Sequence, residues 1–199
     1  MAHEPSQADL EGCRSQQAVS SATRSYLTVE LASWHDVHAF SCSRDPQAAS
    51  YLQKEVGRYV QEGCGQAYVL EASRGGGSID GYYHLVGSNL RRGDLHNTDQ
   101  KRLPSGAPVS VYVIAYIARD DQAKRGMGAA LLIDAARRAQ ALFPTWGMTL
   151  YANNAKLVEF YKGFGFKLIR SLHQADTAVG VLPDEAPYLM YAPYRSLVL

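Results

Sequence analysis

The sequence has few cysteines and no excess of charge of either sign. Its three cysteines, Cys13, Cys42 and Cys64, are widely spaced and odd in number, so they fit neither a disulfide framework nor a Cys-x-x-Cys metal site. Unpaired thiols are typical of a reducing cytoplasm, and we therefore expect a cytoplasmic protein. The formal net charge is +1, so no global field indicates a nucleic-acid or anionic-membrane partner.

Long apolar runs are also absent, and we expect no leader. The chain has no stretch of about 18 consecutive apolar residues, so we expect no membrane-spanning helix. No basic start followed by an apolar stretch is visible, so we expect no secretory signal. Residues 1–25 are rich in Ser, Gln and Ala, which predicts a disordered or loosely docked tail. Residues 26–199 suit one domain, because 46% of the chain is hydrophobic and can form a core.

Two common phosphate-binding motifs are missing from the turn around Gly126. The P-loop needs Gly-Lys-Ser/Thr, whereas this chain has Met127-Gly128-Ala129. A dinucleotide fingerprint needs three spaced glycines directly after a strand. Here seven residues separate Ala118 from Gly126, and the third glycine is absent.

The same turn is nevertheless flanked in the way an anion site requires. The run Val109–Ala118 is rich in β-branched and aromatic residues, which predicts a buried strand. After a charged turn, Gly126 and Gly128 precede an Ala- and Leu-rich segment that predicts a helix. The first N–H groups of a helix lack intrahelical partners and lie at the positive end of its dipole. Glycines at this place let a phosphate approach the backbone closely.

This turn resembles the pyrophosphate loop of the GNAT superfamily of acyl-CoA N-acyltransferases, whose pattern is Gln/Arg-x-x-Gly-x-Gly/Ala. The chain matches the pattern at Gly126 and Gly128 but has Ala123 where Gln or Arg is usual. A second block follows at the family's spacing, with Leu157 where Ala is usual. Its matching residues are Asn154, Tyr161, Gly165 and Phe166.

The resemblance implies the GNAT acetyltransferase fold, which is mixed α/β. Its central, mostly antiparallel sheet has splayed fourth and fifth strands and is flanked by helices. It also implies acetyl-CoA as cosubstrate and no metal. Tyr161 would protonate the leaving thiolate as a general acid. The residues implied to contact acetyl-CoA are Tyr116, Ile117, Ala118, Lys124, Arg125, Gly126, Met127, Gly128, Ala129 and Asn154.

Each of these roles has a plainer alternative. The main chain of Tyr116 to Ala118 would otherwise take part only in sheet pairing, and the loop would be a solvated basic turn. Asn154 would only cap a helix, and Tyr161 would be a core tyrosine at helical spacing.

Hydrophobic periodicity predicts the element order β-α-β-β-β-α-β-α-β-β, in agreement with that fold. Strands are expected at 26–31, 67–72, 79–87, 109–118, 147–151 and 166–169 and from 188 onward. Asp45 and Pro46 predict a helix start, and that helix should end at residues 63–65. The helix after Gly128 is expected to bury Leu131, Leu132, Ala135, Ala139 and Leu142 and to show Arg137 and Arg138 to solvent. Residues 89–108 and 173–185 are expected to be loops.

A closer resemblance, over roughly residues 26–199, is to the GNAT toxins of bacterial toxin–antitoxin pairs. It is carried by a His-Asp-x-x-x-Phe-x-Cys segment at residues 35–42, by Gly81-Tyr82-Tyr83, and by Leu103-Pro104. It implies acetylation of the α-amine of aminoacyl-tRNA and allows an antitoxin partner and a homodimer. The alternatives are acetylation of a small amine or a protein N-terminus, or an inactive module that binds CoA or a partner protein.

The central strand contains no Glu, Asp or His that could act as a general base. A lysine amine has a pKa near 10.4, whereas an α-amine near 7.7–8.0 needs little help to lose a proton. The missing base therefore favours an α-amine or an activated amine as acceptor, although His84 or Glu30 could still act through water. His35 and His38 are expected in core or capping roles rather than as a metal pair.

Basic residues occur in four adjacent pairs, which could form one positive face for an RNA backbone. The alternative is four separate, solvated charge pairs. The pairs are Arg91-Arg92, Lys101-Arg102, Lys124-Arg125 and Arg137-Arg138.

Overall fold

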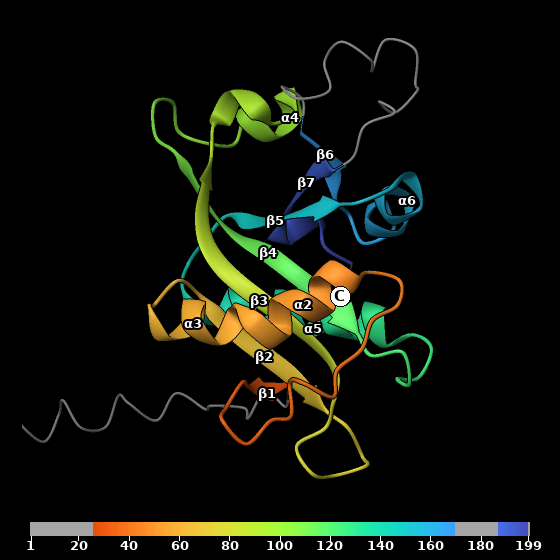
Figure 1. Cartoon of the computed structure of the whole chain (residues 1–199). Coiled ribbons are helices and arrows are strands. Elements are labelled where there is room, and N and C mark those ends of the chain that lie inside the picture. Colours follow the sequence, from red (N-terminus) through yellow and green to blue (C-terminus); the bar gives the residue numbers. More distant parts are fainter. Residues whose placement is uncertain (1–25, 170–186, 199) are drawn as a thin grey trace, which may run out of the picture.

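A computed structural model describes residues 26–169 and 187–198 (Figure 1). The expected tail over residues 1–25 and loop over 173–185 lie outside these ranges. The described strands form one seven-stranded sheet in the order β1-β2-β3-β4-β5-β7-β6. They are β1 (Val29–Glu30), β2 (Gln66–Glu71), β3 (Ile79–Leu90), β4 (Val109–Arg119), β5 (Gly147–Ala152), β6 (Lys167–Leu168) and β7 (Tyr188–Pro193).

Adjacent strands are antiparallel except β4 and β5, which run parallel. These two strands pair only from Val111, opposite Gly147, to Ile114, opposite Leu150. Beyond that point β4 continues to Arg119 and β5 to Ala152, so their ends part. The mixed sheet with splayed fourth and fifth strands is confirmed.

Helices cover both faces of the sheet. They are α2 (Pro46–Lys54), α3 (Val56–Gln61), α4 (Asn97–Gln100), α5 (Met127–Leu142) and α6 (Ala155–Lys162), with 3-10 turns η1 (Arg92–Asp94) and η2 (Tyr194–Ser196). In Figure 1, α2 and α3 cross the front of β2 to β4, whereas α5 lies behind them. A core cluster on the first face joins Leu52 to Tyr82, and a larger one joins Leu131 of α5 to Tyr83 and Ile114.

Local sequence signals predicted some boundaries of helices and strands correctly and others not. The helix at Pro46 begins as expected, because Asp45 Oδ1 accepts a hydrogen bond from Ala48 N at 3.1 Å. That helix is broken at Glu55 into α2 and α3, and the first strand is shorter than 26–31. The expected loop over 89–108 is wrong in part, because β3 extends to Leu90 and this segment then forms η1 and α4.

The prediction for the solvent face of α5 is wrong at two positions. Leu142 is 40% exposed instead of buried. The Arg138 guanidinium lies over the rings of Tyr26 and Tyr68, at 4.0 and 4.1 Å, and donates to the Thr28 carbonyl at 2.6 Å. Helical periodicity could not show these partners, because Tyr26, Thr28 and Tyr68 lie far away in the sequence. Arg138 therefore ties α5 to the segment that leads into β1.

A glycine in β3 allows α5 to lie close to the sheet. A Cβ atom at Gly81 would meet Leu131 Cδ1 at 2.6 Å and the Ala118 carbonyl oxygen at 3.1 Å. A side chain at this position would force Leu131 to shift, whereas glycine leaves the strand and the helix in contact. The close contact positions the N-terminus of α5 next to the end of β4.

A buried carboxylate connects α4 to the other end of the sheet. Asp99 is 2% exposed and accepts from Lys167 Nζ and from the Tyr191 hydroxyl, each at 2.9 Å, and from Arg195. Burial acts to raise the pKa of this carboxyl, but the hydrogen bonds from Lys167 and Tyr191 and the charges of Lys167 and Arg195 outweigh burial. The pKa of Asp99 is therefore below its usual range.

The Asp99→Asn variant should be less stable than wild type at pH 7, by about 1–3 kcal/mol in free energy of unfolding. Because the folded pKa lies below the unfolded value of about 3.9, this contribution is complete above that pH and disappears as pH falls through the folded pKa. Urea titrations should show the difference closing in acid. A difference that is constant with pH would contradict the ion-pair origin, and Glu62→Gln, in an exposed pair, is the control.

Candidate active site

A cleft of about 700 Å³ opens where β4 and β5 part. One wall comes from residues between Cys42 and Gln47, just before and at the start of α2. The end of β4, from Ile117 to Arg119, forms its floor with Gly128 of α5, and residues between Asn153 and Tyr161 form the other wall. The cleft therefore brings together both sequence blocks that carry the family resemblance.

The end of β4 presents a free main-chain edge to this cleft. Tyr116, Ile117 and Ala118 pair with β3 on one side, but β5 has already diverged on the other. Ile117 and Ala118 line the cleft. The Tyr116 ring instead stacks on Tyr51 of α2, with centroids 4.0 Å apart, so the contact of its main chain with acetyl-CoA stays a prediction.

The loop before α5 has the free donors that a diphosphate requires. Gly126 is the N-cap of α5 with φ of +89°, a conformation suited to glycine. The amide of Ala129 already donates to the Gly126 carbonyl at 3.0 Å. Within the described residues, the main-chain amides of Lys124, Arg125, Gly126 and Gly128 have no hydrogen-bond partner.

Space is also available at this loop. A Cβ atom at Gly126 or Gly128 would meet nothing within 4 Å, so the backbone is open to a ligand on both sides of the helix start. Lys124 and Arg125 are exposed and add positive charge. The free amides, the open glycines and the two cations fit the diphosphate of an acyl-CoA.

Tyr161 lies on α6 at the wall of the cleft. Its side chain packs against Phe160 and Phe166, at centroid distances of 5.3 and 5.9 Å, and the residue is 6% exposed. Burial, assisted by the negative charge of Asp45, raises the pKa of Tyr161 to about 12. The phenol is therefore protonated at neutral pH, and its hydroxyl has no hydrogen-bond partner among the described residues.

Asn154 is a helix cap in this structure. Its Oδ1 accepts from Leu157 N at 3.0 Å at the start of α6, and the residue also lines the cleft. The capping role is thus observed, and the contact with acetyl-CoA remains a prediction.

Neither candidate base reaches the cleft directly. His84 is 1% exposed and lies 2.9 Å from the Tyr51 hydroxyl through Nδ1. Burial lowers its pKa against the opposing effect of the Cys64 carbonyl, so the ring is neutral but enclosed. Glu30 lies on β1, at the far edge of the sheet from β5.

Sequence reasoning missed the one carboxylate of the described cleft lining, Asp45. It was predicted only as a helix cap, which uses Oδ1. Its Oδ2 accepts from Asn153 Nδ2 at 3.4 Å, across the cleft. An Asp-Pro pair indicates a helix start, but no local pattern reveals which distant loop the second oxygen will face.

Other sequence candidates are separated from this cleft. His35 Nε2 lies 3.2 Å from Glu71 Oε1, and His35 Nδ1 accepts from Ala32 N at 2.9 Å, so His35 closes a turn. The described residues contain no group of three or more His, Cys, Asp or Glu side chains that could hold a metal ion. No helix in that part of the chain is long and apolar enough to cross a membrane.

The four basic pairs belong to separate segments. The segment around α4, which carries two of them, is at the top of Figure 1, whereas the loop before α5 is at the lower right. Arg138 of the fourth pair is held by aromatic rings and by Thr28. Arg138 is therefore engaged within the fold, and a positive face formed by the other basic pairs stays a prediction.

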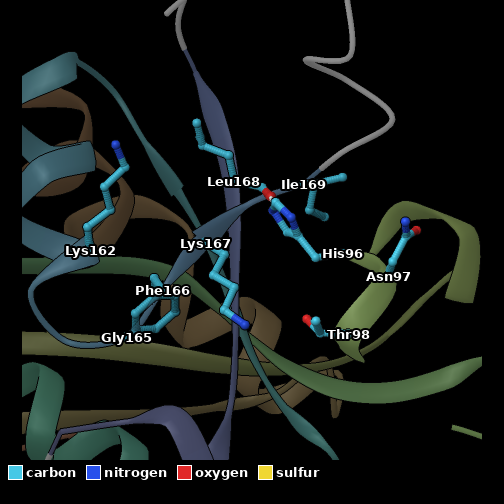
Figure 2. A pocket seen from close by; sticks show the side chains of 9 residues that line it. All are labelled: His96, Asn97, Thr98, Lys162, Gly165, Phe166, Lys167, Leu168 and Ile169. Atoms are coloured by element: carbon cyan, nitrogen blue, oxygen red, sulfur yellow. Dashed lines mark hydrogen bonds between the residues drawn. The ribbon is translucent and has the colours of Figure 1, made fainter. Parts of the chain in front are cut away.

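A larger hollow, of about 810 Å³, lies between α4 and β6 (Figure 2). Its charged groups are already engaged: Lys167 with Asp99, and Lys162 with Glu159 at 2.7 Å. His96 Nε2 lies 3.2 Å from the Leu168 carbonyl oxygen. Figure 2 shows Lys162 extending away from His96. This hollow contains neither the loop amides nor Tyr161, so we assign the chemistry to the smaller cleft.

No protein-family model and no curated protein matches the sequence. Solved structures do match the fold. AtaT complexed with acetyl-methionyl-tRNAfMet has a TM-score of 0.68 at 23% identity, over 86% of this chain and 96% of that one. A mutant of KacT has a TM-score of 0.65 at 23% identity, over 81% and 89%. The chain has the fold of the GNAT toxins AtaT and KacT.

Another AtaT structure, AtaTR bound with acetyl-CoA, has a TM-score of 0.64 at 23% identity, over 85% of this chain and 94% of that one. The similarity to these toxins therefore extends over nearly their whole length, which is a property of the fold and not of one motif.

Gly128 offers a cleaner test of the loop than Gly126, whose positive φ would strain any other residue. Gly128→Ala should bind acetyl-CoA, because the family pattern allows Ala there, and should stabilise α5 by up to about 1 kcal/mol. Gly128→Glu should fold, because a carboxylate suits a helix N-terminus, but should repel the diphosphate.

At 100 times its dissociation constant, acetyl-CoA should stabilise wild type and Gly128→Ala by about 2.7 kcal/mol in thermal melts. Gly128→Glu should show no such stabilisation. Equal stabilisation of all three proteins would place the diphosphate elsewhere.

Proposed function

We propose that this protein transfers the acetyl group of acetyl-CoA to a primary amine, and that its acceptor is the α-amine of aminoacyl-tRNA. The observation that carries the proposal is the convergence of three features in one cleft. These are the free edge of β4, the unpartnered amides of the loop before α5, and the protonated hydroxyl of Tyr161. The likeness to AtaT in complex with acetyl-methionyl-tRNAfMet and with acetyl-CoA supports it.

Different parts of the cleft would bind different parts of acetyl-CoA. The main chain of Tyr116 to Ala118 would pair with the amides of the thioester arm in the manner of an added strand. The loop amides, with Lys124 and Arg125, would hold the diphosphate. Tyr161, on the opposite wall, would face the sulfur of the thioester.

In the reaction, the amine nitrogen forms a bond to the thioester carbon while the carbon–sulfur bond breaks. Tyr161 donates its phenolic proton to the departing sulfur, which leaves as the thiol of CoA. The proton lost by the amine returns to the phenolate through water. An ordinary tyrosine is already protonated at neutral pH, and the raised pKa of Tyr161 makes it a weaker acid. The proton would therefore move only as the carbon–sulfur bond breaks and charge develops on the sulfur.

The residues that line the cleft favour an α-amine as acceptor. Among the described lining residues there is no histidine, and Asp45 is the single carboxylate. An α-amine is partly neutral at pH 7 and needs no strong base, whereas a lysine amine does. The charge of Asp45 would attract the ammonium form of the acceptor. Acetylation of aminoacyl-tRNA would block translation, so we further propose a toxin role with an antitoxin partner.

Labelled acetyl-CoA and a mixture of charged tRNAs test the substrate. After nuclease digestion, mass spectrometry should find the label on the α-amine of the aminoacyl-adenosine, and none with uncharged tRNA. Label on added polyamines or on peptide N-termini, with none on charged tRNA, would replace the tRNA proposal by the corresponding alternative. No transfer to any amine, with acetyl-CoA still bound, would indicate an inactive binding module.

Tyr161→Phe tests the proton donor. The ring and its packing remain, so folding and acetyl-CoA affinity should change little. The turnover number should fall by about 10²–10⁴-fold, which is the usual contribution of general acid catalysis. The fall should be the same with every acceptor, because the phenol acts at the sulfur. Phe160→Leu, in the adjacent cleft position, is the packing control, and near-normal turnover of Tyr161→Phe would leave Tyr161 as a packing residue.

A further inference from the structure

The pyrophosphate loop of this chain lacks a side chain that its family pattern normally has. Ala123 occupies the first position of the loop, where Gln or Arg is usual, and its methyl group cannot form a hydrogen bond. The residue is 8% exposed, so the position is enclosed by the protein. The loop nevertheless keeps an ordered shape, with Ala123 N donating to the Asp120 carbonyl at 3.1 Å.

Arg119, four residues earlier, supplies hydrogen bonds at this place. Its NH1 donates to the Ala123 carbonyl at 2.9 Å and to the Asp120 carbonyl at 3.3 Å. Arg119 is the last residue of β4. Because side chains alternate along a strand, it shares a face with Ile117. Both residues line the cleft together with Gly128. The guanidinium thus lies between the loop and the floor of the cleft.

The charge of Arg119 acts on Asp121 only at a distance: hydrogen bonds from Ser43 contribute most to lowering the pKa of Asp121, and Arg119 adds a smaller effect. No ion pair within 4.0 Å joins it to a carboxylate of the described residues. The nearby Asp120 carboxylate is occupied by Ser41 N at 2.8 Å and Gln122 N at 2.9 Å, and Asp121 accepts from Ser43 N at 2.9 Å. The Nε and NH2 groups of Arg119 have no partner in the same part of the chain.

We infer that Arg119 replaces the missing side chain of the loop: its NH1 fixes the loop, and its remaining N–H groups bind the diphosphate of the acyl donor. A guanidinium suits this double role, because its donors point in fixed directions and match phosphate oxygens in pairs. The inference rests on the proposed function, since it assumes an acyl-CoA in the cleft. It adds a specific cationic contact that the sequence pattern does not assign.

The test compares acetyl-CoA with S-acetylpantetheine, which has the same thioester arm but no diphosphate. Arg119→Gln should weaken acetyl-CoA binding by about 10–100-fold in calorimetry, the usual loss for hydrogen bonds to a charged group. Transfer from S-acetylpantetheine should keep its kcat/KM. The acetyl-CoA affinity of Arg119→Lys should lie between those of wild type and Arg119→Gln, because lysine keeps the positive charge but cannot form the paired hydrogen bonds. Arg137→Gln, an exposed change of equal charge on α5, should match wild type with both donors.

Each possible result bears on the inference for Arg119 or on the proposed function. Unchanged acetyl-CoA affinity in Arg119→Gln overturns the inference, with the proposed function intact. An equal loss with both donors also overturns it, because Arg119 would then only maintain the cleft. If Arg119→Gln does not fold, Arg119→Lys decides, and wild-type affinity in that variant overturns the paired contact. If wild type binds neither donor, the proposed function itself fails.

Discussion

The whole site depends on the point at which β4 and β5 stop pairing. Parallel strands that stayed together to their ends would satisfy each other's main chain and leave no edge for a ligand. Here the ladder ends at Ile114 and Leu150, and the last residues of β4 keep an open side. A ligand that can pair like a strand can complete the sheet at this edge.

The same pair of strands explains why the loop and Tyr161 meet there. β4 and β5 are parallel, and each is followed directly by a helix, α5 after β4 and α6 after β5. Both connections therefore leave the sheet at the same end, and both helices begin beside the open edge. α5 contributes unpartnered amides, and α6 contributes Tyr161. Gly81 contributes from the neighbouring strand by letting α5 lie close to β3.

Sequence reasoning predicted the elements whose signals are local. The strand, glycine turn and helix around Gly126 lie within one short stretch, and the cap at Asp45 is a direct neighbour effect. What it missed depends on contacts between distant segments. The aromatic partners of Arg138, the bonds of Asp99 that order α4, and the position of Asp45 in the cleft all join residues far apart in the chain. The hydrogen bond from Arg119 to the Ala123 carbonyl was also missed, because Arg119 lies outside the loop motif.

Amide hydrogen exchange with and without acetyl-CoA tests the central claim, that the acyl donor binds where β4 and β5 part. Binding should slow exchange in peptides that cover residues 116–119 and 124–129, because these main-chain groups gain partners. Peptides that cover α4 and β6, around the larger hollow, should not change. Protection at α4 and β6, with none at the end of β4 or in the loop before α5, would contradict the account.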